Sequence, residues 1–103
     1  MSGLKLQVVK MTEEELLKLS DNLFTIIDSL EIINFLPNDI TISEEGIALV
    51  FVSSNDSKYI NIECLYAGDI VTICKNANFT EIWELHIDTI ISELNYLKKF
   101  YYK

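Results

Sequence analysis

Residues 39 to 74 constrain the fold most, because apolar side chains recur there at every second position and only short connections separate the runs. Such alternation is typical of strands with one buried face, and the uninterrupted apolar run 47–52 is typical of a strand buried on both faces. Neighbouring strands joined by short turns must pair antiparallel. The sequence therefore predicts an antiparallel meander with strands at residues 40–42, 47–52, 58–66 and 70–74.

A long amphipathic helix is predicted before the meander. It starts with the capping box Thr12-Glu13-Glu14-Glu15, in which the Thr12 hydroxyl accepts from the Glu15 amide and the Glu15 carboxylate accepts from the Thr12 amide. An apolar stripe at steps of three and four residues follows, and Pro37 disfavours helix just before itself. The predicted helix runs from Met11 to about Ile33. Residues 4–9 alternate weakly, as in a short strand or an extended arm.

The last segment of the chain has two interpretations. In one, Asn78 and Glu81 cap a single long helix with a regular apolar stripe. In the other, residues 81–87 form a fifth strand with Trp83, Leu85 and Ile87 inward, and Asp88 caps a shorter helix that ends near Phe100. Aromatic and β-branched side chains at positions 82, 83 and 87 favour the strand. The predicted fold class is α+β: an N-terminal helix, an antiparallel meander of four to five strands and a C-terminal helix, in one domain spanning residues 1–103.

The charge distribution argues against nucleic acids and membranes as partners. The chain has 8 lysines, no arginine and 16 acidic residues, which gives a net charge of −8. Surfaces that bind nucleic acids depend on positive charge and favour arginine, and anionic membranes attract basic segments. Seven acidic residues lie between Lys18 and Lys58 with no basic residue among them. Without a membrane-length apolar run or a signal peptide, we expect a cytoplasmic protein whose acidic surface either meets a basic partner or maintains solubility.

The two cysteines, Cys64 and Cys74, fall on neighbouring predicted strands. With a two-residue turn at Gly68-Asp69, Cys64 would face Ile73 and Cys74 would face Glu63, so the thiols would point to opposite faces of the sheet. Two cysteines and one histidine are too few for a zinc site at any usual spacing. We therefore expect free thiols in or near the core, and no metal or other cofactor.

No catalytic residue is predicted. His86 is the single histidine, and no nucleophile motif accompanies it. Glu63 and Glu84 would serve as a carboxylate pair only if their strands faced each other across a cleft. The three glycines lie too far apart to form a phosphate-binding loop. The lysines and aromatic residues of positions 98–103 fit a helix end that folds back on the core better than a site for single-stranded nucleic acid.

One face of the predicted sheet is expected to stay open. Two helices can cover one face, and the other would still carry apolar side chains from the neighbourhood of Val50, Tyr59, Leu65, Ile70 and Trp83. Small monomers seldom leave so large an apolar patch exposed, so we expect a homodimer or a protein partner at this face or at an edge strand. The predicted interaction surface consists of Tyr59, Asn61, Glu63, Leu65, Trp83 and Glu84.

Residues 59–71, Tyr-Ile-Asn-Ile-Glu-Cys-Leu-Tyr-Ala-Gly-Asp-Ile-Val, and the run Ile82-Trp83-Glu84-Leu85 resemble a strand pattern of small uncharacterised prokaryotic proteins. In those proteins an Ile-Glu hairpin is followed by an Ile/Val-Trp-Glu strand and a terminal helix, sometimes beside toxin–antitoxin or mobile-element genes. The resemblance covers about the last 45 residues and implies an antitoxin-side or immunity-type binding protein. In size and acidity the chain also resembles type III secretion chaperones, but Ala67-Gly68-Asp69 leaves no room for the helix that those chaperones place within their strand series.

These features lead to two function hypotheses. The first is a non-enzymatic, dimeric protein-binding module of the antitoxin or immunity class. The second is a small ligand-binding or enzymatic domain with a pocket between sheet and helices that uses Glu63, Glu84 or His86. An acidic dimer similar to the secretion chaperones is a further alternative. A stoichiometric basic partner would favour the first hypothesis, and a bound metabolite or a buried polar cavity would favour the second.

Overall fold

The computed structural model describes residues 13–54 and 57–103, so the predicted arm and the residues Met11 and Thr12 of the predicted helix start lie outside the described part. The elements follow one another as α2 (Glu13–Ile32), β1 (Asp39–Ile42), β2 (Gly46–Val52), β3 (Lys58–Leu65), β4 (Ile70–Asn76), β5 (Thr80–Leu85), the 3₁₀ turn η1 (Ile87–Thr89) and α3 (Ile90–Tyr102). A helix, a five-stranded meander and a second helix confirm the predicted α+β class.

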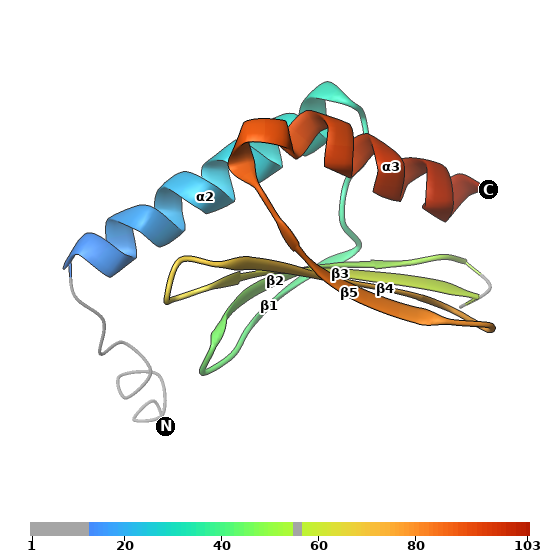
Figure 1. Cartoon of the computed structure of the whole chain (residues 1–103), viewed down its shortest axis with the longest axis horizontal. Helices are drawn as coiled ribbons and strands as arrows, with labels where there is room; N and C mark the ends of the chain where they lie inside the picture. Colours follow the sequence, from blue (N-terminus) through green and yellow to red (C-terminus); the bar gives the residue numbers. More distant parts are fainter. Residues whose placement is uncertain (1–12, 55–56) are drawn as a thin grey trace.

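The five strands form one sheet in the order β1-β2-β3-β4-β5, and every neighbouring pair is antiparallel. Figure 1 shows that α2 and α3 both lie on the same face of this sheet. The core fills the space between the two layers, where the fully buried side chains of the strands meet those of the helices. Those from the inner strands are Leu49, Phe51, Ile60 and Ile62, and those from the helices are Ile26, Leu30, Leu94 and Leu97. No helix within the described residues is long and apolar enough to cross a membrane.

Helix α2 ends in a Schellman motif one residue before the predicted end. The Asn34 amide donates to the Glu31 carbonyl at 3.1 Å, and the Phe35 amide donates to the Leu30 carbonyl at 2.9 Å. Asn34 has a φ of +57°, the left-handed conformation that this motif requires. The side chains of Leu30 and Phe35 are both buried, which supplies the apolar contact that accompanies the motif. The chain therefore leaves the helix with Phe35 directed into the core.

The segment with two interpretations, residues 81–87, contains a fifth strand, as its β-branched and aromatic side chains predict. Strand β5 ends at Leu85, two residues before the predicted limit, and the exposed Ile87 begins η1. The single long helix is thereby excluded. Asp88 lies inside η1 and does not cap α3, because the 3₁₀ turn moves the start of the α-helix to Ile90.

The turn between β3 and β4 is longer than predicted, and this corrects the register. Cys64 lies opposite Ile70, not Ile73, and Cys74 lies opposite Ile60. The Leu65 amide donates to the Asp69 carbonyl, and the φ of +111° at Gly68 allows the chain to reverse there. The observed register differs from the predicted one by three residues, and an odd shift moves a side chain to the other face of a sheet. Both thiols therefore point to the helix-covered face, where they are buried. Four residues along a strand separate them, about 13 Å, which is too far for a disulfide.

Candidate functional site

The sheet face opposite the helices is the first candidate surface. No element among the described residues covers it, and Figure 1 shows the helices only on the other side. The strand registers and the alternation of side chains define this open face. Its members on strands β2 to β5 include Val50, Val52, Tyr59, Asn61, Glu63, Leu65, Val71, Ile73, Lys75, Ile82 and Glu84. More than half of these side chains are apolar, and polar and charged ones lie among them.

Five of the six residues of the predicted interaction surface share the open face, and Trp83 does not. Trp83 lies opposite Thr72, whose side chain is fully buried on the helix-covered face. Ile70 was also expected on the open face and is instead buried in the core, because of the register shift at the turn. The alternation of Trp83 with the buried Leu85 is the sequence signal that places Trp83 on the helix side.

A polar pair lies in the middle of the open face. The Asn61 amide group donates to the Tyr59 hydroxyl at 3.0 Å, and the Lys75 ammonium lies 5.8 Å from the centre of the Tyr59 ring. The Asn61 side-chain oxygen is inaccessible to solvent and has no hydrogen-bond partner among the described residues. Its neighbours across the sheet are Val50 and Ile73. This face therefore combines apolar contact area with a few oriented polar groups.

Of the acidic and histidine candidates, Glu84 and His86 line one hollow of about 320 Å³, and Glu63 is not among its lining residues. Glu63 and Glu84 each lie opposite Val71 on the strand between them, so their backbones are about 10 Å apart. The His86 Nε2 atom lies 3.8 Å from the Glu84 carboxylate, and both side chains are largely exposed. Within the described residues, no group of three or more His, Cys, Asp or Glu side chains could hold a metal ion.

The two cysteine thiols have low reactivity. Burial, with a smaller contribution from Glu63, raises the pKa of Cys64 from 9.0 to about 11. Burial, with a smaller contribution from Glu81, raises the pKa of Cys74 to the same value. Since the thiolate is the nucleophile, both groups are unreactive near neutral pH. They contribute packing to the core.

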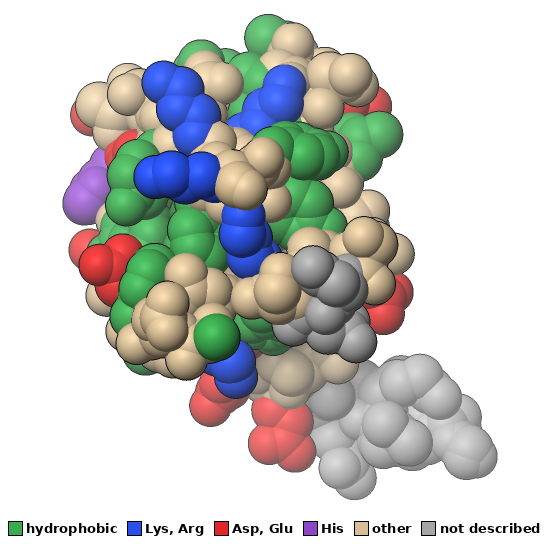
Figure 2. Space-filling view, turned by 90° about the vertical axis from the view of Figure 1, so that its right-hand side faces the viewer, with side chains coloured by type: hydrophobic (Ala, Val, Ile, Leu, Met, Phe, Trp, Pro, Cys, Tyr) green, Lys and Arg blue, Asp and Glu red, His purple; other side chains and the backbone are tan. Residues whose placement is uncertain are grey.

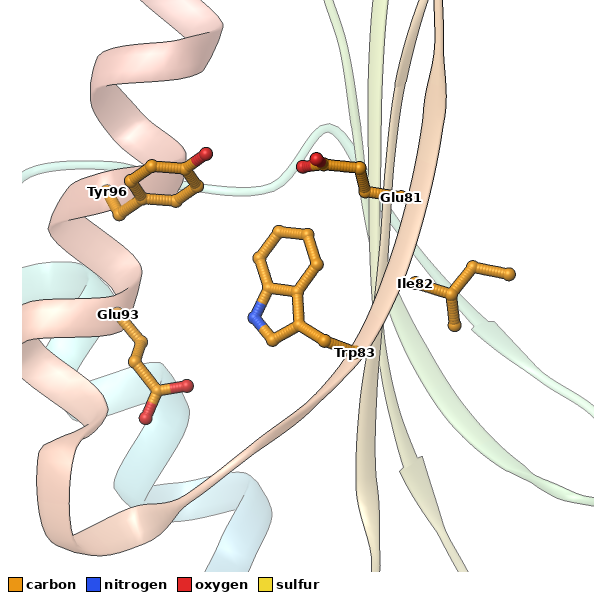
Figure 3. Close-up of a pocket in the computed structure, with 5 residues that line it drawn as sticks. All are labelled: Glu81, Ile82, Trp83, Glu93 and Tyr96. Carbon is orange, nitrogen blue, oxygen red and sulfur yellow. The ribbon is translucent and has the colours of Figure 1, made fainter.

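A cleft between β5 and α3 is the second candidate site. It has a volume of about 570 Å³ and is lined by Glu81, Ile82 and Trp83 from the strand and by Glu93 and Tyr96 from the helix. The Trp83 and Tyr96 rings meet edge to face, with centroids 6.1 Å apart and planes at 73°. Figure 3 shows the indole in the space between the two elements, the carboxylates of Glu81 and Glu93 directed into that space, and Ile82 pointing away. We call this the aromatic–acidic cleft.

The aromatic–acidic cleft continues into a hollow of opposite charge. This hollow, of about 800 Å³, shares Glu81 and Tyr96 with the cleft and adds Phe79, Phe100 and three lysines. The lysines are Lys58, Lys99 and Lys103. Figure 2, which views the end of the molecule where α3 terminates, shows Lys side chains gathered there among hydrophobic ones. The cleft and the hollow together form a groove beside β5 that is acidic in the cleft and basic in the hollow.

The aromatic residues at the chain end fold back on the core, as the sequence indicated. The Tyr101 hydroxyl donates to the Val52 carbonyl at 2.7 Å, and its ring lies 5.3 Å from that of Phe35. The Lys58 ammonium lies 5.7 Å from the centre of the Phe100 ring and donates to the Tyr101 carbonyl. These contacts tie the end of α3 to the sheet.

Sequence reasoning missed the aromatic–acidic cleft, although its parts were visible. On the strand interpretation, Glu81 and Trp83 alternate onto one face, and Glu93 and Tyr96 are one helical turn apart. What the sequence did not supply is the packing that brings the two pairs together. Comparisons of the chain with models of known families, with curated proteins and with solved structures found no match.

Proposed function

We propose that this domain is a non-enzymatic protein-binding module whose open face docks against another protein. One observation carries the proposal: both helices pack on the same side of the sheet, so an apolar sheet face remains without a cover among the described residues. Contiguous apolar patches on small domains mark interaction sites more often than chance allows. Antiparallel sheets with one solvated face usually alternate apolar with polar residues, and this one does so only in part.

The composition of the open face supports a protein partner. Polar side chains such as Asn61 and Glu63 lie on the central strand β3, and apolar ones such as Val50 and Ile73 flank them on the neighbouring strands. Protein interfaces commonly combine apolar contact area with hydrogen-bonding groups. Ile82 extends the apolar area to the edge strand, where 65% of its surface is exposed.

The proposed partner is either basic or a second copy of this chain. The net charge of −8 favours association with a basic protein, because opposite fields speed encounter and disfavour wrong partners. This is the relationship expected of an antitoxin or immunity protein and its target. A homodimer through the same face would instead bury its apolar side chains against those of a second copy.

The test compares the intact chain with two lysine variants. Ile73→Lys places a charge on the open face beside Asn61, and Phe24→Lys places one on the outer surface of α2, where Phe24 is 67% exposed. We expect one stoichiometric partner to copurify from the source cell with the intact chain and with Phe24→Lys, and to be lost with Ile73→Lys. Circular dichroism checks that both variants remain folded.

Light scattering at tens of micromolar separates the two kinds of partner. A dimer that Ile73→Lys dissociates and Phe24→Lys leaves intact identifies the partner as a second copy. A monomer that nonetheless recovers a basic protein identifies a heterologous partner. Retention of every partner by Ile73→Lys would contradict the assignment to the open face.

A ligand-binding function is the second candidate. The observation that favours it is the aromatic–acidic cleft, a hollow between sheet and helix with two aromatic rings and two carboxylates. Of the residues that the sequence suggested for such a pocket, Glu84 and His86 line a different hollow, and Glu63 lines neither.

A further inference from the structure

We infer that the aromatic–acidic cleft binds the cationic head of a lysine or arginine side chain that a partner polypeptide presents in an extended strand beside β5. This site lies on the helix side of the sheet and is distinct from the open face. The inference therefore does not depend on the function proposed for that face.

The side chains that line the cleft favour a cationic ligand. Electron-rich ring faces attract ammonium and guanidinium groups, most strongly when the ring is tryptophan. Because the Trp83 and Tyr96 rings meet at 73°, they present surfaces that are nearly perpendicular to each other. The carboxylates of Glu81 and Glu93 approach the same space from the strand and from the helix (Figure 3). An anionic ligand would be repelled by both carboxylates.

Neither carboxylate is neutralised from within the described part of the chain, where no lysine lies within ion-pair distance of Glu81 or Glu93. Glu93 is nevertheless held in place. Its Oε2 atom accepts hydrogen bonds from the Thr89 hydroxyl and from the His86 amide, the latter at 3.4 Å. The Oε1 atom of Glu93 takes no part in these two hydrogen bonds. A carboxylate that is already oriented loses less side-chain freedom when a cation binds.

The position of the cleft beside an edge strand points to a polypeptide rather than to a free amine. Within residues 13–54 and 57–103, strand β5 pairs with β4 alone, so in this part of the chain its outer backbone groups are available to an added strand. Such a strand would lie about 4.8 Å from β5, and every second side chain would point to the helix side, as Trp83 and Glu81 do. Backbone hydrogen bonds would provide affinity, and the cleft would require a basic residue at one position.

The extension of the groove fits the same occupant. Beyond Glu81 the hollow becomes basic and apolar, with Phe79, Phe100 and Lys99. A strand that continues along β5 past the cleft would carry apolar or acidic residues there. The groove therefore specifies a sequence in which a basic residue at one end is followed by apolar or acidic residues.

Trp83 is the sole tryptophan, so its fluorescence reports directly on the cleft. The probe is a short peptide of alternating valine and threonine with one central arginine, added to the full chain. Matched probes are the same peptide with glutamine in place of arginine, and arginine amide alone. We expect the arginine peptide to shift Trp83 emission saturably, and the glutamine peptide and arginine amide to bind at least tenfold more weakly, about the effect of one good cation–π contact with its ion pair.

Two variants assign the effect to the cleft. Glu81→Gln removes a carboxylate that faces the cleft, and Glu84→Gln removes one on the same strand that faces the opposite way. Both side chains are exposed, so both variants should fold. We expect Glu81→Gln to weaken the arginine peptide roughly fivefold to tenfold and Glu84→Gln to leave it unchanged. The inference is overturned if the arginine peptide gives no shift at millimolar concentration, if the glutamine peptide or arginine amide binds equally well, or if the two variants behave alike.

Discussion

The Phe35 ring stacks on the Phe51 ring, with centroids 4.4 Å apart and planes inclined by 21°. Phe35 is the last residue of the Schellman motif of α2, and Phe51 lies on β2, so the stack joins the end of the first helix to the sheet. Tyr101 of α3 contacts both rings, at 5.3 Å and 6.4 Å between centroids. Three elements distant in sequence therefore meet at this cluster, which makes it a determinant of the relative placement of helices and sheet.

Truncating Phe35 should be among the most damaging single changes. We expect Phe35→Ala to lower the free energy of unfolding by about 3–5 kcal/mol, because it removes a ring that is 1% exposed and leaves a cavity against Phe51. Phe24→Ala is the matched control, since Phe24 is 67% exposed, and it should change stability by less than about 0.5 kcal/mol. Urea denaturation followed by circular dichroism measures both. Equal effects of the two substitutions would refute the role assigned to the cluster.

The left-handed residue Asn34 offers a stabilising substitution. Glycine adopts a positive φ without a steric penalty, so Asn34→Gly should raise the free energy of unfolding by about 0.5–1 kcal/mol. Asn34→Ala should lower it by about 1 kcal/mol, because a Cβ is disfavoured in this conformation and alanine has no polar side chain to compensate. Thermal unfolding of the three proteins should rank them Gly, Asn, Ala. An alanine variant as stable as the glycine variant would show that helix α2 does not end in this motif.

Thr72, whose hydroxyl is buried, is a second position where we expect a substitution to stabilise the protein. Its side chain is fully buried between strands β3 and β5, and its hydroxyl has no partner among the described residues. Thr72→Val keeps the branched shape and removes the unpaired group, so we expect a gain of about 1 kcal/mol. Thr41→Val, at an exposed position of β1, is the control and should have little effect. A loss of stability in Thr72→Val would mean that the hydroxyl is hydrogen-bonded, for example to water.

The meander and the first helix were predictable because their signals are local. Period-two runs between residues 40 and 74 and the apolar stripe of α2 each report which residues face a core, whatever the rest of the chain does. Strand β5 was also predictable, from its β-branched and aromatic residues.

What could not be predicted depends on details that periodicity does not encode. The register between β3 and β4 follows from the length of a turn that the positive φ of Gly68 allows, and an error of three residues moved Cys74 and Ile70 to the wrong face. The aromatic–acidic cleft depends on how α3 packs beside β5, which brings Tyr96 to Trp83. Side chains from two elements meet there only in the folded chain, so no local pattern identifies the site.

We expect the two buried thiols to make the stability of the protein fall at alkaline pH. Burial raises the pKa of Cys64 and Cys74 from 9.0 to about 11, so between these values the unfolded chain loses thiol protons that the folded chain keeps. The stabilisation that the protonated thiols contribute is complete well below pH 9 and decreases as the pH rises. At pH 11 it has fallen by about 2 kcal/mol per thiol. Burial also raises the pKa of Tyr101, which acts in the same direction above pH 10.

A double variant, Cys64→Ala with Cys74→Ala, isolates the contribution of the thiols. Its truncated side chains lower stability by an amount that does not depend on pH, whereas Tyr101 is present in both proteins. Between pH 8 and pH 11 the free energy of unfolding of the natural chain should therefore fall by about 4 kcal/mol more than that of the double variant. Urea titrations at several pH values provide the comparison. Parallel pH profiles for the two proteins would show that the folded state does not retain the thiol protons, and would argue against the burial of Cys64 and Cys74 beneath the helices.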